Sequence, residues 1–567
     1  MQIWGFSVLM NQFLSNYCRV PNFVLRYIKR KKRRRLKSMM RGFRLLNNTN
    51  KLGIIRELKA DLMNTRFIRI DQTASPEIFG AAFPNAELAV RQFLLQKLVG
   101  IPLNKALLYS LGTNGTSVIF PLPSAWQSVL IDHGFKVAKA RSLLAWGGIV
   151  GLCFCYGVLT IARIVVSSIR GLMRHRNDFV PKEYAYFEKL SAGNLPQRCG
   201  DERSYDIVNW YSQWEGRAKG LDAYCHDVRA DSCTTASGIR VEYIGNSIPK
   251  LSNLKDLLRF SVWILKAVIR SASDIFVGRW CHALLLGEAA NATIIRLVES
   301  ERLAKDYLFH YSGTIYRPLW TYEAEEKNSR IITYFYSTSE QVKLPQGYVS
   351  QGYEWGAVNW PNLLVWDKYQ EELLRKDIKY KPDIKVVGPI YFQDSAVELP
   401  KIPSRSIAVF DIEEHRKSAH FGFSTLSEYF NRNPDLNVQF IKDIHLALSE
   451  CEGILVLKQK REIGNKSIKN YKNLLQKLYR SGDIILIDSG ISAVRVIEKC
   501  EGVISLCFTS PALYMRDQGI PTVYYDPTGW IQKDDRGGHG VPILSGIEEL
   551  RFWLRRILQE NKKELIS

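Results

Sequence analysis

The sequence predicts an α/β protein whose C-terminal part is a doubly wound parallel sheet. Three observations lead to this: from residue 406 onward short strand-like segments alternate with helical ones, the strand-like segments are apolar throughout, and 46% of the 567 residues are hydrophobic. Strands that alternate with helices pair in parallel, and such strands are covered on both faces, which explains the uninterrupted apolar runs. A charged fraction of 24% is ordinary for a globular protein and excludes wholesale disorder or a fibrous repeat.

The C-terminal elements follow one another regularly. We expect strands at 407–410, 453–457, 483–487, 502–506 and 521–525, and helices at 424–431, 438–449, 465–480, 491–499, 511–518 and 546–560. Upstream, segments rich in aromatic and β-branched residues predict strands at 307–310, 331–336 and 362–366, with a helix at 367–376. The segment Leu399–Ser404 carries two prolines and predicts a linker, which divides the chain into an arm (1–46) and two domains (47–399 and 400–567).

The net charge of +22 is concentrated in the arm. No Asp or Glu precedes Glu57, whereas twelve Lys or Arg lie between Arg19 and Arg44, seven of them consecutive at Lys29–Arg35. Basic residues interleaved with aromatic ones favour a partner with anionic lipid headgroups. A cleavable signal would place its cations before the apolar part, and here the order is reversed. Nucleic acid is the alternative partner, but only the 29–35 run supports it, so none is expected.

The segment 142–162 is long, apolar and uncharged. Its 21 residues can cross a hydrocarbon core, but four glycines also fit a buried helix. The flanking residues 118–122, 124–132 and 135–137 predict a β-α-β unit, which a single crossing would split. We therefore favour a dip into one leaflet, with residues 163–173 returning along the interface. A second amphipathic region, 254–298, predicts core packing, with contact to a membrane as the alternative.

The ten cysteines form no CxxC pair and have no His at zinc-ligand spacing. This predicts reduced thiols in a cytosolic compartment rather than a disulfide framework.

Candidate ligand-binding residues follow four of the predicted strands. In an open parallel sheet, ligands bind beyond the carboxyl ends of the strands. Lys458, Lys460 and Arg461 follow one strand, and the polar turn containing Ser489 follows the next. Thr509 and Ser510 begin a helix with Pro511 in its first turn. A helix N-terminus faced by cations from a neighbouring strand predicts a diphosphate site. Asp526 and Glu548 are candidates for a contact with the ribose or the base of a nucleotide.

Several common catalytic motifs are missing from the chain. It contains no GxxxxGK[ST], GxGxxG or GxSxG, which disfavours P-loop, dinucleotide-binding and serine hydrolase functions. No D-x-D occurs, so we expect no metal ion and no other cofactor, with backbone dipoles and fixed cations stabilising the diphosphate instead.

The stretch LCFTSPALYMRDQGIPTVYYDP (506–527) resembles the hallmark of the bacterial polysaccharide biosynthesis PFTS motif proteins, with Cys507 in place of the first Pro. The segments VLKQKR (456–461) and QGYEWGAVNWPNLLVWDKY (351–369) also resemble that family, and the likeness covers roughly 300–567. More distantly, the small-residue helix start followed by G-I-P-T-V-x-x-D is similar to the donor domain of GT-B glycosyltransferases.

The resemblance implies two Rossmann-like domains of GT-B type, with 47–399 on the acceptor side and 400–567 binding a nucleotide-sugar donor. It also implies surface-polysaccharide assembly at the cytoplasmic face of a bacterial inner membrane, with a glycan or lipid-linked acceptor. A general base should lie in the first half, where Asp71, Glu77, His310 and Glu354 are candidates. An epimerase or polyol-phosphate transferase on the same scaffold, and a non-catalytic assembly protein attached to the membrane, are the competing functions.

Overall fold

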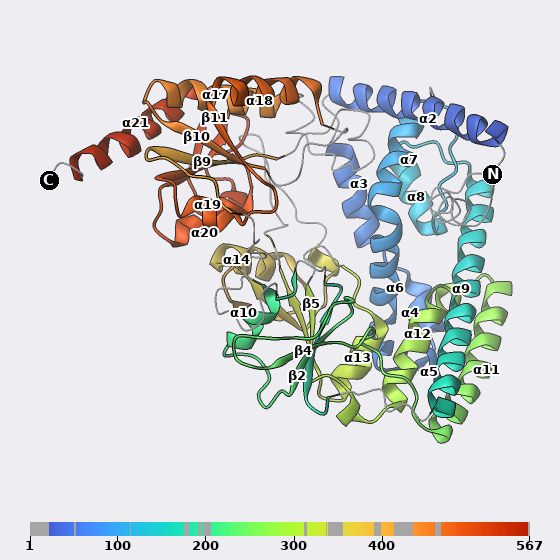
Figure 1. Ribbon diagram of the computed structural model, residues 1–567. Helices are drawn as coiled ribbons and strands as arrows, with labels where there is room; N and C mark the ends of the chain where they lie inside the picture. The colour runs from blue at the N-terminus through green and yellow to red at the C-terminus, as the bar shows by residue number, and fades with distance from the viewer. Residues whose placement is uncertain are drawn as a thin grey trace.

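The computed structural model describes residues 22–49, 53–113, 115–174, 181–190, 194–196, 206–310, 315–335, 337, 355–389, 398–412, 435–459 and 467–564. Two separate sheets organise these residues, and a group of long helices lies beside the first sheet (Figure 1). The α/β class predicted from the sequence is confirmed.

The second sheet lies in the C-terminal part of the chain and is parallel throughout. Its strands are β9 (Ser406–Phe410), β10 (Ile454–Lys458), β11 (Ile484–Ile487), β12 (Gly502–Leu506), β13 (Thr522–Asp526) and β14 (Ile543–Ser545). The strand order is β11-β10-β9-β12-β13-β14, so the direction of winding reverses between β9 and β12. The helices are α17 (Leu436–Ser449), α18 (Lys469–Ser481), α19 (Ala493–Ile497), α20 (Ser510–Asp517) and α21 (Ile547–Glu564). Helices α17, α18 and α21 cover one face, and α19 and α20 the other (Figure 1).

The five predicted strands of this sheet are all present, with ends shifted by at most one residue. The sixth strand, β14, was missed, and the predicted helix at 424–431 lies outside the described residues. One inference was wrong: β10 and β12 are not neighbours, because β9 lies between them.

The first sheet repeats the same winding. Its strands are β1 (Tyr184–Glu188), β2 (Ala223–His226), β3 (Cys233–Thr234), β4 (Arg240–Tyr243), β5 (Asp306–His310), β6 (Arg330–Tyr334), β7 (Asn362–Val365) and β8 (Asp383–Val386). They lie in the order β3-β4-β2-β1-β5-β6-β7-β8, with only β3 antiparallel, so the winding reverses between β1 and β5. Both sheets therefore have the open, doubly wound topology that places ligands where the strand order reverses.

Helices precede and surround the first sheet. They are α2 (Asn22–Asn48), α3 (Gly53–Asn64), α4 (Ile68–Thr73), α5 (Pro76–Phe79), α6 (Ala86–Leu94), α7 (Ile101–Leu111), α8 (Ser124–Asp132), α9 (Lys139–Arg174), α10 (Ile207–Gln213), α11 (Leu254–Phe276), α12 (Cys281–Leu297), α13 (Leu319–Glu326) and α14 (Lys368–Asp377). The short elements η1 (Gly80–Asn85), η2 (Leu95–Val99), η4 (Ser300–Arg302), η5 (Trp355–Ala357) and, in the second half, η6 (Arg536–Gly538) complete the described elements. The expected β-α-β unit around α8 is present as a single parallel bridge between Val118 and Val137.

The apolar segment lies inside one continuous helix, α9, which runs on to Arg174. The expected interfacial return at 163–173 is therefore wrong, because these residues prolong the same helix. Helix α9 packs along α12: the Trp146 and Trp280 rings meet edge-on at 5.2 Å, and a Cβ at Gly157 would lie 2.8 Å from the Cβ of Leu286. It is the one described helix long and apolar enough to cross a membrane, with a mean hydropathy of 2.2 and 17% of that window buried.

Seven of the described cysteines are free thiols. Cys233 in β3 is disulfide-bonded, so the expectation of reduced cysteines is wrong at this position.

Candidate active site

The strand-order reversal of the second sheet is bordered by polar residues. Lys458, Phe410 and Ser505 lie in one row across β10, β9 and β12, as their backbone pairing shows. Strands in a sheet are about 4.8 Å apart, so the backbones of Lys458 and Ser505 are about 10 Å apart. The end of β9 lies between them, and there the buried Asp411 accepts a hydrogen bond from the Tyr471 hydroxyl.

Lys458 is a buried lysine with only two described partners. Its side chain is 7% exposed, and its Nζ donates to the backbone oxygens of Gln459 at 2.8 Å and Ser489 at 2.9 Å. Burial lowers the pKa of Lys458 to about 8, and the charge of Asp488 offsets part of that effect. An ammonium group has three N–H donors, so one N–H has no partner among the described residues. The structure thus brings Lys458 and the backbone of Ser489 together.

The turn between β12 and α20 carries the second set of predicted residues. Thr509 occupies the N-cap position of α20, but its side chain caps no N–H, and its buried Oγ1 has no partner among the described residues. The backbone oxygen of Thr509 accepts a hydrogen bond from the Tyr524 hydroxyl at 2.9 Å, which fixes the turn against β13. The first N–H groups of a helix have no intrahelical acceptors, so Ser510 and Ala512 present donors at the edge of the sheet, whereas Pro511 between them has no N–H.

Two further predicted donor residues have other partners. Both Asp526 carboxylate oxygens accept hydrogen bonds from its own loop, from Thr528 and from the backbone N–H of Ile531 at 2.8 Å. Glu548 is exposed on α21, beyond the outermost strand, and forms an ion pair with Arg551. The structure therefore does not bring these two residues together with Lys458. Lys460 and Arg461 lie outside the described residues.

The candidates in the first half of the chain are dispersed. Asp71 on α4 and Glu77 on α5 are exposed, and Asp71 forms an ion pair with Arg66 at 3.5 Å. Neither lies at an end of the first sheet. His310 ends β5, next to the strand-order reversal, which is a suitable place for a catalytic group. Glu354 lies outside the described residues.

Sequence analysis missed Glu188, the last residue of β1. It lies beside Phe309 of β5, so it borders the strand-order reversal of the first sheet. Burial raises the pKa of Glu188, while a hydrogen bond with Ser247 and the charge of Lys189 offset part of this effect. The aromatic segment YAYFE that forms β1 was the signal available in the sequence, since it has the composition of a strand and ends in a carboxylate.

The two halves meet through a buried cluster at the carboxyl end of β7. Asp367, the N-cap of α14, accepts from His539 Nδ1 at 3.0 Å and from Arg516 at 3.1 Å. Burial alone would raise the pKa of Asp367, but the hydrogen bond from His539 and the charges of His539 and Arg516 lower it. Arg516 also donates to the backbone oxygen of His539 and lies 5.5 Å from the centre of the Tyr369 ring. This cluster fixes the first sheet against α20.

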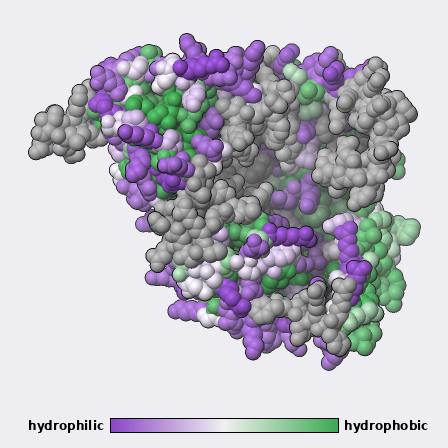
Figure 2. Space-filling model, in the orientation of Figure 1, coloured by the Kyte–Doolittle hydropathy of each residue, from purple (hydrophilic) through white to green (hydrophobic). Residues whose placement is uncertain are grey.

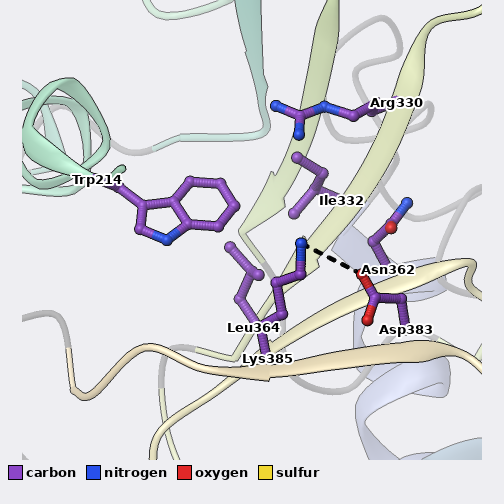
Figure 3. Close-up of a pocket in the computed structure, with 7 residues that line it drawn as sticks. All are labelled: Trp214, Arg330, Ile332, Asn362, Leu364, Asp383 and Lys385. Carbon is purple, nitrogen blue, oxygen red and sulfur yellow. Dashed lines mark ion pairs between the residues drawn. The ribbon is translucent and has the colours of Figure 1, made fainter. Parts of the chain in front are cut away.

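A depression on the first sheet is a separate feature. Figure 3 shows it between Trp214, which directly follows α10, and the face formed by β6, β7 and β8, with Lys385 and Asp383 paired at 3.3 Å. It includes the first residues of all three strands, and is completed by Arg330, Ile332, Asn362 and Leu364. Because ligands bind at the opposite, carboxyl ends of parallel strands, we do not assign the substrate to it. Among the described residues, no three His, Cys, Asp or Glu side chains are grouped to hold a metal ion.

Comparison with protein families identifies the chain. A family model described as "Polysaccharide biosynthesis PFTS motif protein" matches residues 263–554. The chain belongs to this family. In this PFTS motif protein the motif reads Cys507-Phe508-Thr509-Ser510, and it forms the turn between β12 and α20. No curated protein matches the sequence.

Several solved structures align with part of the chain at low identity. A TarM structure is 9% identical and aligns 47% of this chain with 51% of its own, at a TM-score of 0.26, so the alignment spans about half of TarM. The UDP-GlcNAc 2-epimerase of Methanocaldococcus jannaschii is 9% identical, with coverage of 66% and 92% and a TM-score of 0.34. A variant of the wall teichoic acid polymerase TagF is 13% identical, with coverage of 71% and 90% and a TM-score of 0.32. At these TM-scores the likeness carries no information about the reaction.

Proposed function

We propose that this PFTS motif protein is a glycosyltransferase that moves a sugar from a nucleotide sugar to a glycan or lipid-linked acceptor in bacterial surface-polysaccharide biosynthesis. One observation carries the proposal: the strand-order reversal of the second sheet lies between the buried Lys458 and the N-terminus of α20. Ammonium groups and helix N-termini both bind phosphate without a metal ion. Membership of a polysaccharide biosynthesis family supports the choice of a sugar donor over other nucleotides.

The residues suggest a division of roles. Lys458 and the N–H groups that begin α20 would bind the diphosphate and neutralise its charge as it leaves. Glu188 would accept the proton of the acceptor hydroxyl, because a carboxylate with a raised pKa is a better base than an exposed one. In the transfer, the bond between the anomeric carbon and the phosphate oxygen breaks, and the acceptor oxygen bonds to that carbon. The nucleoside diphosphate leaves without help from a metal ion.

The first test is a panel of nucleotides and nucleotide sugars added to the full chain, read out as a shift in thermal unfolding. A ligand at 100 times its dissociation constant stabilises the folded state by about 2.7 kcal/mol. We expect one nucleotide family to shift the transition, and Lys458→Met to reduce the stabilisation at the same ligand concentration to about 0.4–1.4 kcal/mol. Transfer from the same nucleotide sugar should survive EDTA. A flat panel from the folded full chain would favour the non-catalytic assembly protein.

The same panel separates a glycosyltransferase from an epimerase and from a polyol-phosphate transferase. An epimerase would convert the nucleotide sugar with no acceptor present, whereas a transferase requires one. A polyol-phosphate transferase would respond to a nucleotide-activated polyol and not to a nucleotide sugar. Each outcome changes the reaction assigned to the site but leaves its phosphate-binding residues in place.

A further inference from the structure

Helix α11 exposes an apolar stripe to solvent. Six apolar residues of this helix are 58–89% exposed and follow one another at intervals of three, four or seven positions. They are Leu254, Leu258, Val262, Leu265, Ile269 and Phe276. Residues at that spacing share one face of a helix. The opposite face, which includes Phe260, Trp263 and Ala267, is already buried against the protein. The stripe therefore takes no part in the hydrophobic core of the described chain.

The charges of α11 are sorted by sign. Four exposed cations each directly follow a residue of the stripe: Lys255, Arg259, Lys266 and Arg270. The acidic residues of α11, Asp256 and Asp274, are buried, 7% and 3% exposed. Some of these cations have acidic neighbours, as in the pair of Arg270 with Asp274 at 3.1 Å. An apolar stripe bordered by cations, with no exposed carboxylate on the helix, is complementary to an anionic lipid surface.

Helix α9 enlarges this apolar surface. It packs beside α11 and α12, and Leu144, Tyr156, Leu159 and Met173 are 56–78% exposed. Figure 2 shows hydrophobic surface gathered along the edge of the molecule where Figure 1 places α9 and α11. We define the α9–α11 face as the exposed apolar residues of these two helices.

The arrangement of charge argues against a crossing. The first and last of the four α11 cations, Lys255 and Arg270, are 15 positions apart, which is about 22 Å along the axis. If α9 crossed a bilayer, α11 would enter with it, and cations would lie at several depths of the hydrocarbon, where each is costly. With both helices lying in the plane of the membrane, the stripe enters the acyl region and every cation stays among the headgroups.

We propose that the α9–α11 face is a monotopic membrane-docking surface that inserts into one leaflet of an anionic bilayer without crossing it. This goes beyond the sugar-transfer proposal and does not depend on it. Docking would place the sheets beside a membrane, where lipid-linked substrates are available.

The test is co-sedimentation of the full chain with vesicles. We expect binding to phosphatidylcholine vesicles that contain 30% phosphatidylglycerol, and at least tenfold weaker binding to pure phosphatidylcholine. The triple variant Leu258→Gln, Leu265→Gln and Phe276→Gln should weaken binding at least tenfold. Phe552→Gln is the matched control, because Phe552 is 72% exposed on α21, away from this face. Circular dichroism and the unfolding midpoint without lipid establish that each variant is folded.

A second measurement tests the orientation. Lys139→Cys and Arg170→Cys place a thiol near either end of α9, and a membrane-impermeant maleimide is added outside vesicles carrying the bound protein. Mass spectrometry distinguishes these sites from the native cysteines. Labelling of both supports in-plane docking, and protection of one supports a crossing and overturns the proposal. The proposal is also overturned if the triple variant binds vesicles as wild type does, or if light scattering shows that the stripe holds two copies together.

Discussion

Substitution of Lys458 by methionine tests the donor site most directly. Methionine retains most of the buried aliphatic volume but removes the ammonium group, and the backbone oxygens of Gln459 and Ser489 lose their partner. A hydrogen bond to a charged group contributes about 1.5–3 kcal/mol. Since 1.4 kcal/mol is a factor of ten in affinity, the dissociation constant of the nucleoside diphosphate should rise about 10- to 100-fold. Isothermal titration of the full chain measures it.

The pH dependence adds a second, independent readout. The pKa of Lys458 is lowered to about 8, so the ammonium form that binds phosphate is dominant below pH 8 and is lost above it. Wild-type affinity should therefore fall by up to about tenfold per pH unit above pH 8, while Lys458→Met shows no such decrease. Protein stability should change in the opposite direction. The unfolded lysine keeps its proton up to its ordinary pKa, so the unfolding free energy rises with pH between the two values.

The matched control is Lys477→Met, which removes the same charge from the exposed surface of α18. It should change neither the affinity nor its pH dependence. Equal affinities of Lys458→Met and wild type, in folded proteins, would refute the assignment of the donor site. A loss of affinity that is identical at pH 7 and pH 9.5 would refute the role given to the charge.

Three further predictions concern other parts of the molecule. Glu188→Gln should lower kcat by about 100-fold or more, whereas Glu183→Gln, at the other end of β1, should not; equal rates would remove Glu188 from the reaction. Gly157→Ala should lower the unfolding midpoint, because the new Cβ would lie 2.8 Å from the Cβ of Leu286. Gly147 has open space around it, so Gly147→Ala should raise the midpoint. Equal shifts of the midpoint would mean that α9 does not pack on α12. Asp367→Asn should lower the unfolding free energy by about 3 kcal/mol at pH 7. This difference in unfolding free energy from wild type should shrink as the pH falls through the lowered pKa of Asp367, below its ordinary 3.8. A difference that is independent of pH would contradict the ion-pair cluster.

Strands β5 to β7 and β9 to β13 could be predicted from the sequence because each is a short apolar run with clear ends, whereas β1 to β4 and β8 were not predicted. The order of the strands could not, since it depends on which chain segments pair after the loops close. The insertion of β9 between β10 and β12 is such a long-range outcome, and it separates Lys458 from Thr509 by one strand more than the sequence pattern indicated. The strand β14 has three residues and too little pattern to detect.

The site was predictable only in part, for a related reason. Lys458 and Thr509 were found because both directly follow apolar runs, which fixes their place at the edge of the sheet. Glu188 was missed because recognising it requires knowing that β1 lies beside β5, although the two are far apart in the chain. The partners of Asp526 also could not be foreseen, since they belong to the conformation of its own loop.

Helix α20 connects the proposed phosphate position with the contact between the two halves of the chain. Its first residue, Ser510, lies at the proposed phosphate position, and Arg516 in its last turn contacts Asp367 of the other half. Eight residues of α-helix form a rod of about 12 Å, too short to bend appreciably. If the proposed diphosphate binds at Ser510, a tilt of α20 on binding would also move Arg516 and change its contact with Asp367.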